Sequence, residues 1–339
     1  MADDLGLGLM LGYWQRHADD ATETVLAAER LGYHSVWTAE AYGSDAFTPL
    51  AWYGARTSRI RLGTGVAQIS ARAPVTTAMT ALTLDHLTGG RLLLGIGASG
   101  PQVVEGWYGA PFPRPLARTR EYVEIMRKVW RRAEPVTSPG PHYPLPYPGG
   151  TGLGRPLKSI THPLRPAVPL YLGAEGVRNV ALAAEIADGW LPLFTFPEKI
   201  EEMYGEALAK ARPGFDIAAM VTVTVTGDVR AALDGVKLML ALYIGGMGAA
   251  KRNFHADIVS RMGFAEAAER IQALYLSGRK EEAFRAVPDE LADGISLVGP
   301  PARIRERLAA WRESPVTTLL VMGPRDEDTL RTVRDLVLG

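Results

Sequence analysis

The chain has 339 residues, of which 47% are hydrophobic, and its 37 basic and 37 acidic side chains give a formal net charge of zero. This composition allows a large core and argues against nucleic acid or an anionic membrane as a partner. The absence of cysteine excludes disulfides, thiolate catalysis and cysteine-ligated metals. The sequence shows neither a run of about 18 apolar residues nor the order of charges of a signal peptide. We therefore expect a cytoplasmic protein.

Short apolar strands alternate with amphipathic helices in the first third of the chain. The predicted strands are 7–11, 35–37, 60–66 and 91–96, and the predicted helices are 17–31, 47–57, 75–87 and 118–132. Repeated strand-then-helix units indicate a parallel sheet with right-handed crossovers.

Residues 133–167 interrupt this alternation, because they are rich in proline and glycine and show no periodicity. We predict that they form a long loop insertion. The alternation then resumes with predicted strands 170–172, 190–193, 218–226 and 317–322 and with predicted helices 177–187, 198–211, 301–311 and 327–338. Residues 229–287 are predicted to be a helical insertion, and 295–298 a short extra strand.

Eight strands and eight helices predict an α/β protein with a (β/α)8 (TIM) barrel, a single domain over 1–339 with insertions after the fourth and seventh strands. An open doubly wound sheet is the alternative. It is less favoured because no Gly-x-Gly-x-x-Gly fingerprint follows the first strand.

The clearest strand–turn–helix unit contains the turn Gly173-Ala174-Glu175-Gly176, after which a helix begins at Val177. Two glycines allow the backbone to approach a ligand closely, and a helix N-terminus attracts anions. The turn therefore predicts a site for a phosphate-bearing cofactor, with an ordinary short turn as the alternative interpretation.

The loops that follow the predicted strands carry the active site if the fold is a barrel. These loops are poor in acid–base pairs and rich in small and aromatic residues, and the histidines show no metal-ligand spacing. We expect no metal. Small residues around a concave mouth favour a flat cofactor ring that lies against the backbone and supplies the chemistry. The loops in question are 13–14, 40–45, 65–68, 97–102 and 173–177.

From Gly6 onward the chain resembles the bacterial luciferase-like superfamily, and within it the branch dependent on coenzyme F420, a 5-deazaflavin. That branch includes methylenetetrahydromethanopterin reductase. The stretches that carry the resemblance are 38–45, 61–66, 84–92, 95–101 and 184–190, in this order along the chain.

The resemblance implies an oxidoreductase that transfers a hydride between coenzyme F420 and a small organic substrate. It also implies a homodimer formed through the helices beside the second and third strands. A non-prolyl cis peptide at Gly65–Val66 would support the ring from behind. The remaining implied cofactor contacts are Gly97, Ala98 and Ser99 at the ring edge, and Gly173, Ala174, Glu175, Gly176 and Val177 at the phosphate.

Glu40 occupies the position of an acidic group beside the ring in this family. It is a candidate general acid, a residue that only orients the cofactor, or a salt-bridged carboxylate at a loop start. Some relatives have a histidine base directly after it, where this chain has Ala41. This difference favours reduction of an unsaturated bond. Asp45 is expected to cap the following helix, and Trp14, Tyr42 and Trp107 are the candidate substrate-pocket residues.

Two alternatives remain open on the sequence. One is an FMN-dependent luciferase-like monooxygenase that uses reduced flavin and O2, with Arg72 or Arg178 available for the flavin phosphate. The other is a non-catalytic flavin-binding protein on the same barrel, which the retention of all eight units disfavours.

Overall fold

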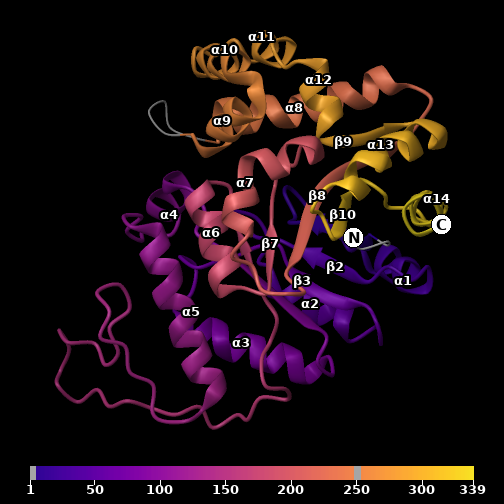
Figure 1. The fold of residues 1–339 in the computed structure, drawn as a ribbon. Coiled ribbons are helices and arrows are strands. Elements are labelled where there is room, and N and C mark those ends of the chain that lie inside the picture. Colours follow the sequence, from indigo (N-terminus) through magenta and orange to yellow (C-terminus); the bar gives the residue numbers. More distant parts are fainter. Residues whose placement is uncertain (1–4, 248–252) are drawn as a thin grey trace.

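The computed structural model describes residues 5–247 and 253–339. Eight parallel strands form a closed ring (Figure 1), because β10 pairs with both β1 and β8. In order around the ring, the strands are β1 (Gly6–Gly12), β2 (Ser35–Thr38), β3 (Arg61–Thr64), β5 (Leu92–Gly97), β6 (Leu170–Gly173), β7 (Gly189–Leu191), β8 (Asp216–Val225) and β10 (Thr318–Met322). The predicted (β/α)8 barrel is confirmed, and the open sheet is excluded.

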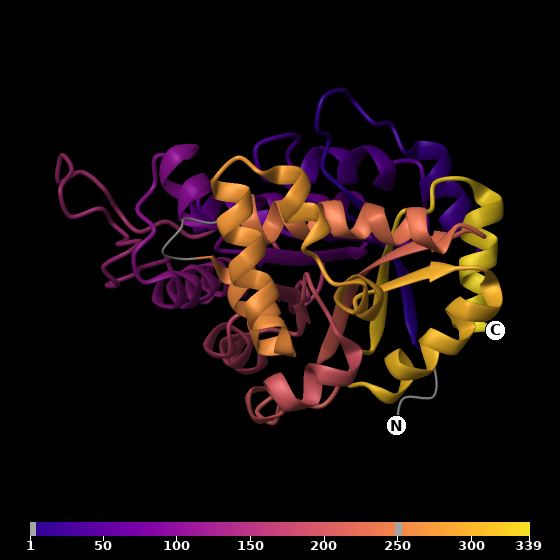
Figure 2. The same cartoon turned by 90° about the horizontal axis from the view of Figure 1, so that it is seen from above.

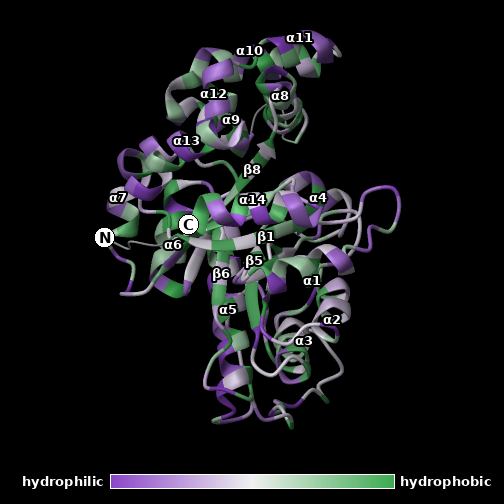
Figure 3. Ribbon diagram, turned by 90° about the vertical axis from the view of Figure 1, so that its right-hand side faces the viewer, coloured by the Kyte–Doolittle hydropathy of each residue, from purple (hydrophilic) through white to green (hydrophobic). Residues whose placement is uncertain are grey.

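Helices surround this ring, and the strands inside it consist largely of hydrophobic residues (Figure 3). The interior is filled by large apolar side chains that include Met10, Trp37, Tyr171, Met220 and Leu320. The outer helices are α1 (Thr22–Arg30), α2 (Phe47–Gly54), α3 (Pro74–Leu87), α5 (Pro115–Arg131), α6 (Val177–Ile186), α7 (Ile200–Leu208, preceded by the 3-10 turn η1, Pro197–Lys199), α13 (Pro301–Glu313) and α14 (Glu327–Leu338).

Two local predictions were wrong, and one short helix was not predicted. The first helix begins at Thr22 rather than at residue 17, because Asp20 accepts a hydrogen bond from the Thr22 backbone and so forms a turn there. A short helix, α4 (Pro101–Gly106), has too few residues to show periodicity in the sequence. The third predicted strand is divided, since β3 ends at Thr64 and a two-residue strand, β4 (Ala67–Gln68), follows.

Both predicted insertions are present. Residues 132–169, all of them described, form no helix or strand beyond one bridge between Ser138 and Leu145. They project from the side of the barrel (Figure 2). The second insertion follows β8 and has a hydrophobic core of its own. Its elements are α8 (Val229–Gly246), α9 (Phe254–Val259), the π-helix η2 (Ser260–Phe264), α10 (Ala265–Leu276), α11 (Lys280–Arg285) and α12 (Asp289–Gly294).

The predicted extra strand is confirmed as β9 (Ser296–Gly299), which pairs with the end of β8 outside the ring. No helix in the described part of the chain has the length and hydropathy needed to span a bilayer.

Candidate active site

Glu40 lies in the loop after β2, and its side chain is only 4% exposed. Its Oε1 accepts hydrogen bonds from the backbone N–H of Gln68 at 2.7 Å and from Nη1 of Arg72 at 2.5 Å. Its Oε2 accepts hydrogen bonds from the backbone N–H of Ala46 at 3.1 Å and from Nη2 of Arg72 at 2.8 Å. Both carboxylate oxygens are therefore occupied, in the bidentate geometry of a strong arginine pair.

This geometry bears on the roles predicted for Glu40. Burial lowers the pKa of the Arg72 guanidinium, but hydrogen bonding to Glu40 and attraction by its charge outweigh burial and raise that pKa. The pair joins the loop after β2 to the segment after β4. The contacts match the interpretation of Glu40 as a salt-bridged carboxylate at a loop start, whereas proton donation and orientation of the cofactor stay predictions. Asp45 caps α2 as predicted, since its Oδ1 accepts from the N–H groups of Phe47 and Thr48, each at 2.8 Å.

The peptide bond between Gly65 and Val66 is cis, as the family resemblance implies. A Cβ added at Gly97 would lie 2.7 Å from Cγ2 of Val66, and one added at Gly173 would lie 2.9 Å from Cγ1. The Val66 side chain thus lies between two glycines at the ends of β5 and β6. The structure brings together three of the predicted cofactor-binding segments around this one side chain.

The carboxyl ends of the strands form the mouth of the barrel, and the segment after β5 lies there too. Ser99 has a left-handed backbone conformation, with φ of 58°. Ala98 lines a small cavity of about 30 Å³ together with Ser70, which follows β4. Ala98 therefore lies beside the segment that follows β4.

The turn Gly173–Gly176 connects β6 to α6, and side chains from distant elements hold its carbonyl groups. The carbonyl of Ala174 accepts a hydrogen bond from Nε1 of Trp190 at 2.7 Å. The carbonyl of Glu175 accepts from the hydroxyl of Tyr204 at 2.7 Å and from Nη2 of Arg261 at 2.9 Å. The N–H groups that begin a helix have no partner within it, so those of Val177 and Arg178 at the start of α6 suit an anion, whereas the N–H of Asn179 donates to the carbonyl of Gly176 at 2.8 Å.

The side chain of Glu175 meets the second insertion, where its Oε1 lies 3.0 Å from Nδ1 of His255. Sequence reasoning missed the contacts of His255, Arg261, Tyr204 and Trp190 with this turn. No spacing or motif signals them, because each partner comes from a different element.

The candidate substrate-pocket residues lie on three neighbouring loops. The backbone N–H of Trp14 donates to Oγ of Ser44 at 2.9 Å, and the hydroxyl of Tyr108 donates to the carbonyl of Ala41 at 3.1 Å. Tyr42 is 54% exposed and Trp107 is 64% exposed, whereas Trp14 is half-buried. The loops that carry all three are thus joined by hydrogen bonds, and the contact of these side chains with a substrate stays a prediction.

Burial, with smaller contributions from Tyr13 and Glu175, raises the pKa of Tyr243 in α8 to about 12. An unfolded tyrosine loses its proton near pH 10. Above that pH the unfolded state releases a proton that the folded state keeps, so the free energy of unfolding is expected to fall by up to about 1.4 kcal/mol per pH unit for this group. Chemical denaturation between pH 8 and 12 measures the slope. The Tyr243→Phe variant is expected to reduce this slope. The control variant Tyr147→Phe, at a 71% exposed position, is expected to leave it unchanged. Equal slopes in the two variants would contradict the assignment of the pH dependence to Tyr243.

The fold defines the class of protein: a (β/α)8 barrel whose mouth, at the carboxyl ends of its strands, is built from backbone, small residues and aromatic side chains. The sequence model of one family, the luciferase-like monooxygenases, matches residues 6–318. The chain belongs to this family.

Individual relatives agree with the family assignment. A Mycobacterium tuberculosis protein, provisionally named a coenzyme F420-dependent oxidoreductase, is 54% identical over 99% of both chains. The 5,10-methylenetetrahydromethanopterin reductase of Archaeoglobus fulgidus is 28% identical over 91% of both. The solved coenzyme F420-dependent tetrahydromethanopterin reductase of Methanopyrus kandleri superposes with a TM-score of 0.78 over 98% of both chains at 22% identity, a likeness of fold alone.

Proposed function

We propose that this protein is a coenzyme F420-dependent oxidoreductase that transfers a hydride between the deazaflavin and a small organic substrate, in the direction that reduces an unsaturated bond. The observation that carries the proposal is the arrangement of Val66 between Gly97 and Gly173, which leaves a mouth of backbone and small side chains. Such a surface suits a flat ring. The name of the 54% identical relative supports coenzyme F420 as that ring.

Unpartnered polar atoms at the mouth fit the polar edge of such a ring. Gln68, Ser70 and Thr195 each have a buried side-chain oxygen without a hydrogen-bond partner among the described residues. Gln68 and Ser70 lie in and after β4, and Thr195 follows β7. A bound ligand with donors and acceptors along one edge would satisfy such atoms, since buried polar groups are normally paired.

The bound deazaflavin supplies the hydride chemistry. In the proposal, Gly65, Val66, Gly97, Ala98 and Ser99 hold the ring, and the segment 173–177 holds the phosphate through the amides at the start of α6. Glu40 is a positioning residue, because its pair with Arg72 fixes the segment that follows β4. Trp14, Tyr42 and Trp107 surround the substrate. Ala41 provides no base, which supports reduction over alcohol oxidation.

Titration with oxidised coenzyme F420 and, separately, with FMN tests the cofactor assignment through quenching of cofactor fluorescence. We expect micromolar or tighter binding of coenzyme F420 and at least about tenfold weaker binding of FMN, a difference of roughly 1.4 kcal/mol. Preference for FMN would refute the proposal.

One observation keeps the FMN-dependent monooxygenase as a second candidate. Arg72 is committed to Glu40, but Arg178, the second residue of α6, has a side chain exposed beside the phosphate turn. A basic residue there suits the terminal phosphate of FMN as well. Oxygen consumption with reduced FMN and a substrate would favour this candidate.

We also propose that the protein forms a homodimer through the outer faces of α2 and α3. The exposed residues of these two helices carry no acidic or lysine or arginine side chain, and they include Trp52, Met79 and Leu87 at 50%, 55% and 73% exposure. Exposed helix faces that lack charged side chains are typical of surfaces that a partner subunit covers.

The double substitution Met79→Glu with Leu87→Glu is expected to convert the dimer to a monomer, because each buried unpaired charge costs several kcal/mol. Sedimentation velocity over a range of protein concentrations measures the change. Leu338→Glu, at a 42% exposed position on α14, is the control and leaves the dimer intact. A wild-type chain that sediments as a monomer would contradict the proposed interface.

A further inference from the structure

Residues 144–164 form the outer part of the first insertion, and we call them the arm. The arm projects from the side of the barrel next to α5 (Figure 1). Seventeen of its residues are exposed, including every residue from 146 to 158. Its exposed apolar side chains are Tyr147, Leu153, Leu157, Ile160 and Leu164, at 71%, 82%, 78%, 92% and 50% exposure. Apolar side chains gathered in this way are typical of a surface that a partner covers.

Hydrogen bonds hold the arm through its backbone and leave its apolar side chains free. The N–H of Val136 donates to the carbonyl of Leu157 at 2.8 Å. Nε of Arg132, at the end of α5, donates to the carbonyl of Ser159 at 2.7 Å. The arm therefore has a defined position on the barrel although its own apolar side chains are not buried.

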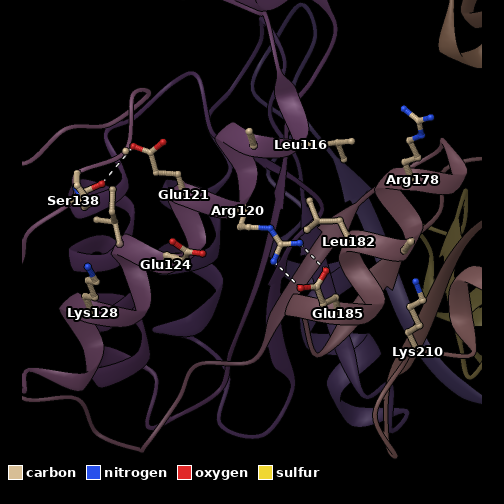
Figure 4. Close-up of a pocket in the computed structure, with 15 residues that line it drawn as sticks. Leu116, Arg120, Glu121, Glu124, Lys128, Ser138, Arg178, Leu182, Glu185 and Lys210 are labelled. Atoms are coloured by element: carbon tan, nitrogen blue, oxygen red, sulfur yellow. Dashed lines mark hydrogen bonds and ion pairs between the residues drawn. The ribbon is translucent and has the colours of Figure 1, made fainter.

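A groove of about 530 Å³ lies between α5 and α6 next to the root of the arm, because residues 138–140 form one of its walls (Figure 4). Seven of its fifteen lining residues are charged, and two of them, Arg120 and Glu185, form hydrogen bonds of 2.7 and 2.6 Å across it. Such walls do not suit apolar side chains, because burial would remove water from the charges. None of the described residues that line the groove belongs to the arm. The groove therefore does not provide a site for the arm on its own chain.

The apolar surface of the arm continues an exposed stripe of α3. The stripe consists of exposed residues at helical spacing, namely Thr76, Met79, Thr83 and Leu87. At the end of this stripe, Nε2 of His86 donates to the carbonyl of His162 at 2.7 Å. A Cβ added at Gly90 would lie 3.7 Å from Cδ2 of Leu164, so Leu164 lies against the turn after α3. The arm thus continues the face for which a second copy is proposed.

The size of a stable interface favours the combination of this face with the arm. A standard interface takes about 20–30 residues from each partner. The helices α2 and α3 offer eight exposed residues, which is too few, whereas the seventeen of the arm bring the surface into that range. A lipid surface fits less well, because the arm has only two lysine or arginine side chains, Arg155 and Lys158, and the stripe has none.

We propose that the arm of each protomer packs against a second copy of this chain and enlarges the homodimer interface of α2 and α3. In a two-fold symmetric dimer each copy contributes its arm, so that one substitution acts twice. This inference rests on the proposed homodimer, and it names a segment outside α2 and α3 that stabilises it.

The double substitution Leu153→Glu with Ile160→Glu is expected to raise the dissociation constant of the dimer about a hundredfold or more, because the dimer would bury unpaired carboxylates. Sedimentation velocity of the full-length protein over a range of concentrations measures this constant. Leu276→Glu with Leu338→Glu, at 50% and 42% exposed positions on α10 and α14, is the matched control and keeps the wild-type constant.

A fluorescent label reports on the arm itself. The chain contains no cysteine, so Thr151→Cys provides a single site on the arm for the environment-sensitive dye acrylodan. We expect the emission to shift to the blue as the protein concentration passes through the dissociation constant, and Ser277→Cys, directly after α10, to show no shift. A blue shift that phosphatidylglycerol vesicles produce and protein concentration does not would identify a lipid surface as the partner and overturn the inference.

The sedimentation results separate the arm from the homodimer. An arm variant that dimerises as tightly as the wild type would overturn the arm contact and leave the proposed homodimer standing. A wild type that forms tetramers, which the arm substitutions reduce to dimers, would place the arm in a different interface and also overturn the inference. A wild type that stays monomeric at every concentration would refute the proposed homodimer, and the arm contact with it.

Discussion

Replacing Arg72 by methionine is expected to lower the free energy of unfolding by about 3–5 kcal/mol, because it leaves the Glu40 carboxylate buried without its counter-ion. The Glu40 side chain is 4% exposed, and the guanidinium supplies two of its four hydrogen bonds. We also expect the affinity for coenzyme F420 to fall, since the pair joins the loop after β2 to the segment after β4. Urea denaturation and the fluorescence titration measure the two effects.

A second buried pair provides the control. Arg165 contacts Asp85 at 2.7 Å, and the Asp85 side chain is 1% exposed. This pair also contacts Leu92 at the start of β5, which is the end of the barrel opposite the mouth. Arg165→Met is therefore expected to cost a similar stability without a change in coenzyme affinity. If both variants lost affinity equally, Glu40 and Arg72 would have only a structural role.

The barrel could be predicted from the sequence because each strand–helix unit has a recognisable pattern within its own residues. Apart from Met220, the segment 218–226 consists of small and β-branched residues, and the structure places β8 at Asp216–Val225. The turn before α6 is equally local, since Gly176 precedes a helix that begins at Val177. The start of α1 was mispredicted because a side chain, Asp20, fixes a turn that hydrophobic periodicity does not report.

The contacts of the site could be predicted only in part. Family resemblance located the cis peptide at Gly65–Val66. The partners of Glu40 and Glu175 lie far away in the sequence, with Arg72 32 residues from Glu40 and Arg261 86 residues from Glu175. Such pairs depend on how neighbouring strands and the second insertion pack, and no pattern within one element contains that information. The groove between α5 and α6 is likewise a product of packing.

Val66 packs closely against Gly97 at the mouth of the barrel. The three atoms nearest to a Cβ added at Gly97 all belong to Val66, with Cγ2 at 2.7 Å and Cβ at 3.5 Å. Gly97→Ala is therefore expected to displace the Val66 side chain at the mouth and to weaken coenzyme F420 binding about tenfold or more. Overpacking of this kind costs about 1–3 kcal/mol of stability.

The double variant Gly97→Ala with Val66→Ala is expected to recover the affinity of Val66→Ala alone, because the clashing methyl group, Cγ2, is gone and the remaining contact, with Cβ at 3.5 Å, is of ordinary length. Gly235→Ala on α8 is the control, since an added Cβ there meets nothing within 4 Å and the position lies outside the predicted coenzyme-binding segments. The fluorescence titration of the four variants, with their unfolding free energies, gives a double-mutant cycle. Strong coupling between positions 66 and 97 in affinity locates the ring against Val66. Additive losses would instead mean that Gly97 acts on the coenzyme by a route that does not pass through Val66.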